Sequence, residues 1–140
     1  MVRKTIIRTK LKEIEESVKL VEENTPETFK EFSGLGLVKD GIYKRLEFSI
    51  ENIFDICSIL NSDLKLGVPG EEEDVFENLL RDNIISNEMG EKLRAMKAFR
   101  NILVHRYGKI DDEIAFNILK KHLPDFYDFM EKIEELLKKF

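Results

Sequence analysis

The chain has 140 residues, with 23 lysines and arginines against 28 acidic residues and a formal net charge of −5 at pH 7. That length favours a single domain over residues 1–140, with enough chain to bury a core. The hydrophobic content of 42% excludes a disordered chain, and no apolar run approaches the roughly 20 residues that cross a bilayer. The charged start is unlike a signal peptide, so we expect a cytoplasmic protein that binds no membrane.

Few residues could hold a metal or form a disulfide. There is one cysteine, Cys57, and there are two histidines, His105 and His122. We therefore expect no zinc site of the usual ligand types, and we expect the protein to reside in a reducing compartment. The acidic run 71–74 resembles a ligand cluster, but it is more typical of the solvated first turn of a helix, where acids meet the positive end of the dipole. The sequence predicts no metal and no cofactor.

Two long helices are predicted in the first half. The spacing of three to four residues that marks an amphipathic helix is seen first in Ile7, Leu11, Ile14, Val18 and Val21. Thr25, with Pro26 behind it, is expected to end this helix and to begin a short turn. After a loop or helix start at 34–41, a helix of about four or five turns is predicted from Tyr43, Leu46, Ile50, Ile53, Cys57 and Leu60.

Four further helices are predicted after a connection at 61–73. The first is short and covers 75–80. Ser86 is expected to cap the second, which carries Leu93, Met96, Phe99, Ile102 and Leu103 and ends at Gly108. Asp111 or Asp112 caps a short third helix, and Pro124 opens the last. No segment alternates like a strand, so the sequence predicts an all-α, antiparallel up-and-down bundle of four main helices plus short ones.

Residues 100–107 concentrate the side chains that are able to act in catalysis. They are Arg100, Asn101, His105 and Tyr107, interleaved with apolar residues that must anchor the helix on the core. At about 100° per residue, Asn101 and His105 share one face, whereas Arg100 and His105 diverge by about 140°. Two copies of the helix, related by a two-fold axis, would bring arginine and histidine from both chains into one cleft. We therefore expect a homodimer.

These side chain types suit cleavage of RNA. The imidazole of His105 would remove the proton of a ribose 2′-hydroxyl, and Arg100 would stabilise the charge that develops on phosphorus. Asn101 would orient the imidazole or bind the substrate. This chemistry needs no metal. From the residues alone, an equally good interpretation is structural, with hydrogen bonds at a helix end and an ion pair between helices.

The spacing of three residues matches the R-x4-H-x-Y signature of HEPN domains: four residues separate Arg100 from His105, and one separates His105 from Tyr107. From about Asp40 to its end, the chain resembles the HepT-like branch of that family. The resemblance implies a homodimeric, metal-independent ribonuclease toxin of a toxin–antitoxin pair, with a minimal nucleotidyltransferase as the cognate antitoxin. It implies that Arg100 and His105 are catalytic, that Asn101 supports them, and that the antitoxin modifies Tyr107 with AMP.

Two groups of basic residues bear on RNA binding. Arg106 and Lys109, with Arg100 and doubled in a dimer, are expected to form a compact basic mouth. A second group lies near the N-terminus and is more typical of a solvated helix face: Arg3, Lys4, Arg8, Lys10 and Lys12. Two alternatives to the ribonuclease stay open. One is a non-catalytic HEPN binding partner of a nucleotidyltransferase, and the other is a helical bundle with no activity.

Overall fold

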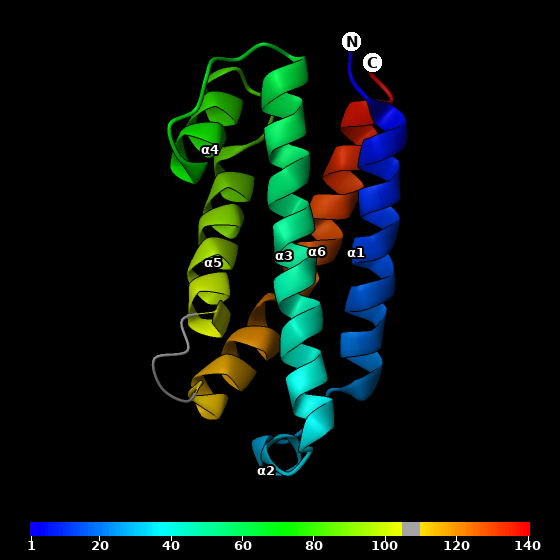
Figure 1. Cartoon of the computed structure of the whole chain (residues 1–140), viewed down its shortest axis with the longest axis vertical. Coiled ribbons are helices and arrows are strands. Elements are labelled where there is room, and N and C mark those ends of the chain that lie inside the picture. The colour runs from blue at the N-terminus through cyan, green and yellow to red at the C-terminus, as the bar shows by residue number, and fades with distance from the viewer. Residues whose placement is uncertain (105–109) are drawn as a thin grey trace.

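The computed structural model describes residues 1–104 and 110–140. Over those ranges every regular element is a helix: α1 (Lys4–Asn24), α2 (Phe29–Ser33), α3 (Leu37–Asp63), α4 (Glu72–Arg81), α5 (Asn87–Val104) and α6 (Asp112–Leu137). The long helices α1, α3, α5 and α6 run alternately down and up, and both termini lie at one end of the bundle (Figure 1). The predicted all-α antiparallel bundle is confirmed.

The turn after α1 differs from the prediction. Thr25 ends α1, because its backbone N–H and its hydroxyl both donate to the carbonyl of Val21, at 2.9 and 2.6 Å. It does not cap a following turn. The short helix α2 begins later, and its cap is Thr28, whose hydroxyl accepts from the backbone N–H of Glu31 at 3.2 Å. Both threonines are residues that commonly cap a helix. Thr25 does not cap α2, because its hydroxyl and its N–H are already bonded to the end of α1.

The central helix α3 is longer than predicted. It has 27 residues and begins at Leu37, directly after Gly36, whose φ of 60° lies in the left-handed region. Gly41 therefore lies inside the helix and not in a loop. α3 contacts α1 on one side and α4 and α5 on the other (Figure 1). Because it is covered on both sides, its buried residues are spread over more than one stripe.

The last helix is continuous across Pro124, so the predicted break between a short helix and a final one is wrong. Proline in a helix interior costs roughly 3 kcal/mol, because a hydrogen bond is lost and its ring clashes with the preceding turn. Burying one large apolar side chain contributes roughly 1.5–3 kcal/mol. Four such side chains flank the proline and are buried, so one continuous helix is favoured: Phe116, Leu119, Phe126 and Phe129.

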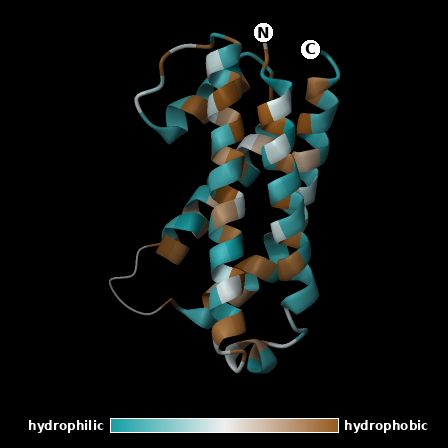
Figure 2. Ribbon diagram, turned by 45° about the vertical axis from the view of Figure 1, so that its right-hand side comes forward, coloured by the Kyte–Doolittle hydropathy of each residue, from teal (hydrophilic) through white to brown (hydrophobic). Residues whose placement is uncertain are grey.

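The core runs along the inner faces of the long helices. The first stripe, from Ile7 to Val21, is buried as predicted, and so is the stripe of α3. The stripe of α5 is buried except for Ile102, which is half-buried. Hydrophobic residues recur along each long helix at helical spacing (Figure 2). In the part of the chain that the structure describes, no helix is long and apolar enough to cross a membrane.

Candidate active site

Arg100 lies in the last turn of α5, where the motif of the sequence begins. Ser86 caps this helix as predicted, with its hydroxyl accepting from the N–H of Met89 at 3.1 Å. Phe99 and Leu103, next to Arg100 around the helix, are buried in the core. Arg100 is thereby directed toward α3 and α4, and its side chain is only 13% exposed. The prediction that apolar neighbours anchor this segment is confirmed for Phe99 and Leu103, whereas Ile102 and Val104 are half-buried.

All three nitrogens of the Arg100 guanidinium donate to side chains of the protein. Nη1 donates to Glu51 of α3 at 2.6 Å, and Nη2 donates to Glu72 of α4 at 2.6 Å. Nη1 also reaches the second oxygen of Glu72 at 3.3 Å, and Nε donates to Asn101 at 3.2 Å. The guanidinium lies 5.2 Å from the ring centre of Phe54. Three helices and an aromatic ring therefore fix its position.

The environment of Arg100 is negative. Hydrogen bonding to Glu72 outweighs burial and, with Glu51, raises the pKa of Arg100 above its ordinary value. The group is therefore a permanent cation at any physiological pH. Two carboxylates against one guanidinium leave a formal charge of −1 among the three. A phosphate that binds Nη1 competes with a carboxylate, because Glu51 and Glu72 accept from both N–H groups of that nitrogen.

Asn101 faces Arg100 in this structure. Its side-chain oxygen accepts from Nε of the arginine, so that oxygen is engaged with the cation. We expected Asn101 to orient the imidazole of His105 or to bind the substrate. Its observed contact is with the neighbouring arginine.

The start of α6 is fixed to α3 as well. Asp112 accepts from the hydroxyl of Tyr43 at 2.6 Å and from Nζ of Lys39 at 2.7 Å. Burial, together with the Asp112 carboxylate, raises the pKa of the Tyr43 phenol above its usual range, so it stays a hydrogen-bond donor. Asp111 caps the helix by accepting from the N–H groups of Glu113 and Ile114, both at 3.1 Å. Thus α3 holds the residues on both sides of segment 105–109.

A family model described as ribonuclease HepT-like matches residues 14–133. The chain belongs to the HepT-like family. The mRNA nuclease HepT of Shewanella oneidensis is 30% identical over 97 residues, which are 69% of this chain and 73% of that protein. A solved structure of the tri-AMPylated Shewanella oneidensis HEPN toxin in complex with MNT antitoxin has a TM-score of 0.82 at 27% identity, covering 93% of this chain and 97% of that one. The cytosolic protein YutE of Bacillus subtilis shares the fold, with a TM-score of 0.82 at 20% identity and coverage of 99% and 92%.

Only part of the HepT-like motif lies within the described ranges. Arg100 and Asn101 are there, whereas four residues predicted for the site lie outside them: His105, Arg106, Tyr107 and Lys109. The proposed roles of these residues stay predictions.

Glu51 and Glu72 are the site residues that the sequence reasoning missed. The acidic run 71–74 was interpreted as a solvated first turn, and that is incomplete. Glu71 and Asp74 form a capping box, whereas Glu72 pairs with Arg100, and Glu73 pairs with Arg94 at 2.7 Å. Among the described residues, no cluster of three or more potential ligands is arranged to hold a metal ion. The run therefore supplies ion pairs to α5.

The N-terminal basic group offers little free charge for RNA. Arg3 pairs with Asp63 at 2.9 Å, and Lys10 pairs with Asp55 at 3.2 Å. Arg8 lies 3.5 Å from Glu134. These pairs agree with the expected solvated helix face.

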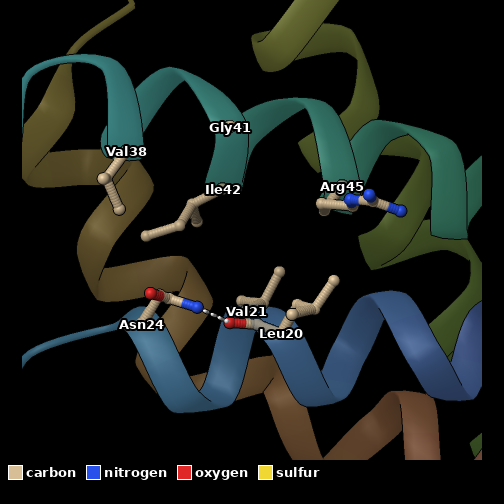
Figure 3. A pocket seen from close by; sticks show the side chains of 7 residues that line it. All are labelled: Leu20, Val21, Asn24, Val38, Gly41, Ile42 and Arg45. Atoms are coloured by element: carbon tan, nitrogen blue, oxygen red, sulfur yellow. Dashed lines mark hydrogen bonds between the residues drawn. The ribbon is translucent and has the colours of Figure 1, made fainter.

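A shallow pocket lies between the end of α1 and the start of α3 (Figure 3). Leu20, Val21, Val38 and Ile42 make its lining mostly apolar. Arg45 is at its margin, with Nη1 donating to the hydroxyl of Ser17 at 3.3 Å. Of the motif residues that the structure describes, none lines this pocket, and its described lining contains no acid–base pair suited to cleaving RNA.

Proposed function

We propose that this chain is a metal-independent RNA endonuclease toxin of a toxin–antitoxin pair. The observation that carries the proposal is the HepT-like match over residues 14–133, which includes the whole R-x4-H-x-Y motif. The anchored guanidinium of Arg100 at the end of α5 supports it, because a fixed cation stabilises charge that develops on a phosphate.

The proposed reaction is an attack by the ribose 2′-hydroxyl on the adjacent phosphorus. His105 takes the hydroxyl proton while the 2′-oxygen forms its bond to phosphorus. The bond from phosphorus to the 5′-oxygen breaks, and that oxygen takes up a proton. The products are a 2′,3′-cyclic phosphate and a 5′-hydroxyl. Arg100 stabilises the charge on the phosphoryl oxygens, Asn101 supports it, and Arg106 and Lys109 bind the flanking phosphates.

Regulation in this proposal acts on Tyr107. The Shewanella toxin has been solved in an AMPylated form with its MNT antitoxin, which supports a nucleotidyltransferase antitoxin as the partner here. Transfer of AMP from ATP to the Tyr107 oxygen, with release of pyrophosphate and loss of the phenol proton, would place a bulky anion two residues from His105. Its negative charge would repel RNA from a cleft that already contains Glu51 and Glu72. The cleft is proposed to form between two protomers, because the spacing of Arg100 and His105 would place them on diverging faces of an ideal helix.

One observation favours the alternative, a non-catalytic binding partner of a nucleotidyltransferase. All three guanidinium nitrogens of Arg100 are engaged, as they would be in a purely structural ion pair. In that case the segment around Tyr107 would serve as a docking and modification site. The two functions differ in whether the unmodified protein cleaves RNA.

The test is RNA cleavage by unmodified protein, verified by intact mass, in excess EDTA. His105→Ala should abolish cleavage. His122→Ala is a matched control because His122 is the only other histidine, and it pairs with Asp125 at 2.9 Å within α6. Cleavage that survives in His105→Ala would overturn the catalytic assignment. No cleavage by wild type, together with a stable complex with the nucleotidyltransferase, would favour the binding partner.

A further inference from the structure

The contacts of Arg100 limit how a phosphate can bind. A guanidinium has five N–H groups, and a phosphate accepts from one of them or, frequently, from two parallel ones on one edge of the fork. The edge formed by Nη1 and Nη2 faces the two oxygens of Glu72, at 3.3 and 2.6 Å. Nε is engaged by Asn101, and the other contact of Nη1 is with Glu51 at 2.6 Å. Both N–H groups of Nη1 therefore have an acceptor, and a phosphate that binds Nη1 must displace Glu51 or Glu72.

The two carboxylates hold Arg100 differently. Glu72 contacts two nitrogens and lies in the first turn of α4, where the helix dipole favours its negative charge. Its turn is also closed by the capping box of Glu71 and Asp74. Glu51 contacts one nitrogen, from the surface of α3, and its side chain is 48% exposed against 39% for Glu72. Glu51 therefore loses fewer contacts than Glu72 when it leaves Arg100, and its carboxylate can move into water.

We propose that Glu72 is a positioning residue that holds Arg100 for catalysis, and that Glu51 yields its place on Nη1 to a phosphate of the RNA. The inference rests on the proposed function, since it assigns parts to residues around the same arginine. While Glu72 stays bound, Arg100 keeps its position above Phe54 before and after the phosphate binds. With Glu51 displaced, the formal charge of the two remaining groups is zero, and an anion can approach.

The proposal predicts opposite effects for two substitutions of the same kind. Glu51→Gln removes a charge that competes with phosphate, so KM for RNA should fall by about fivefold, the weight of one unit charge at about 4 Å in water. Its kcat should stay close to that of wild type. Glu72→Gln weakens the contacts that orient the guanidinium, so kcat should fall by about tenfold or more, because a misplaced catalytic group lowers the rate.

Two neighbouring glutamates provide matched controls. Glu73 lies in the same turn of α4 and pairs with Arg94, so Glu73→Gln removes the same charge next to Glu72 without touching Arg100. Glu47 lies one turn before Glu51 on α3 and pairs with Lys44 at 3.1 Å. Both control variants should leave KM and kcat within about twofold of wild type, as expected of surface pairs.

Binding of an RNA with a methoxy group at every 2′ position separates this inference from the proposed function. This RNA cannot be cleaved by 2′-hydroxyl attack, so its affinity can be measured by fluorescence anisotropy in an inactive protein as well. If wild type fails to cleave ordinary RNA, the proposed function fails, and the inference still predicts tighter binding by Glu51→Gln. Absence of RNA binding by every variant would overturn the inference too.

Three results would overturn the inference. The first is an unchanged or raised KM in Glu51→Gln. The second is a shift of the same parameter in the same direction by Glu51→Gln and Glu72→Gln. The third is a control that reproduces either effect. Should Glu72→Gln lose its cooperative thermal transition, the half-exposed Glu51 still decides the matter through KM and through the affinity for methoxy RNA.

Discussion

Replacing Arg100 by alanine should weaken the fold only moderately. The change removes two ion pairs, the contact with Phe54 and the packing of the arginine stem. Glu51 and Glu72 keep 48% and 39% of their side-chain surface in water, so each pair counts as a surface pair of roughly 0.5 kcal/mol. The contact with Phe54 at 5.2 Å adds about 0.5–1 kcal/mol. After the arginine regains its rotamer freedom, the net loss should be about 1–2 kcal/mol.

The assay is urea unfolding followed by far-UV circular dichroism, with the free energy of unfolding extrapolated to water. The slope against urea should match wild type, because the surface exposed on unfolding is unchanged. Arg94→Ala is the control, since it breaks a single pair between α5 and Glu73 of α4 and should cost less than about 1 kcal/mol.

Two results would refute this reasoning. A loss above about 4 kcal/mol is the size of a broken buried ion pair, and it would make Arg100 a structural centre. No loss at all would mean that these contacts contribute nothing in solution. The predicted middle value matters for function, because a folded Arg100→Ala protein without activity can then be attributed to chemistry.

The remaining predictions concern assembly, acid stability and thiol reactivity. Arg100→Ala and His105→Ala should each be inactive. Refolding the two variants together should restore RNA cleavage, because a heterodimer keeps one intact Arg100 and one intact His105 in the cleft between its protomers. No recovery would contradict a cleft built from both protomers. The hydrogen bond from Arg3 lowers the pKa of Asp63 in the folded protein. The Arg3–Asp63 pair therefore contributes stability above about pH 4, the pKa of an aspartate in the unfolded chain, and this contribution is lost as the pH falls through the lower pKa of the folded state. Asp63→Asn should therefore be less stable than wild type at pH 7 in urea unfolding, with the difference shrinking in strong acid; an equal difference at both pH values would contradict it. Burial raises the pKa of Cys57 to about 12, so a thiol reagent at pH 8 should label the protein only at the rate of unfolding, and rapid labelling of the native protein would show an accessible thiol.

Much of the fold follows from local patterns in the sequence. The stripe in α1 and the Ser86 cap of α5 depend on residues close together in the chain, and they were predicted correctly. The errors fell where two local rules competed. Thr25 suits either the end of one helix or the start of the next, and Pro124 disrupts a helix whose flanking apolar residues favour continuity.

The site was predictable only in part, for a physical reason. The R-x4-H-x-Y spacing singles out Arg100 within its own helix. The partners that hold Arg100 come from other helices, with Glu51 separated from it by 49 residues and Glu72 by 28. Only the packing of α3 and α4 against α5 brings them together. The one available signal was the acidic run at the start of α4, which the helix dipole explained equally well.

The central claim, cleavage by 2′-hydroxyl attack, is tested most directly by the chemistry of the product ends. A short RNA would be cleaved in excess EDTA by mass-verified unmodified protein, and the products would be identified by mass spectrometry. The proposed function predicts 2′,3′-cyclic phosphate and 5′-hydroxyl ends from wild type and His122→Ala, and none from His105→Ala. Products with 3′-hydroxyl and 5′-phosphate ends, or cyclic phosphate ends from His105→Ala, would contradict it.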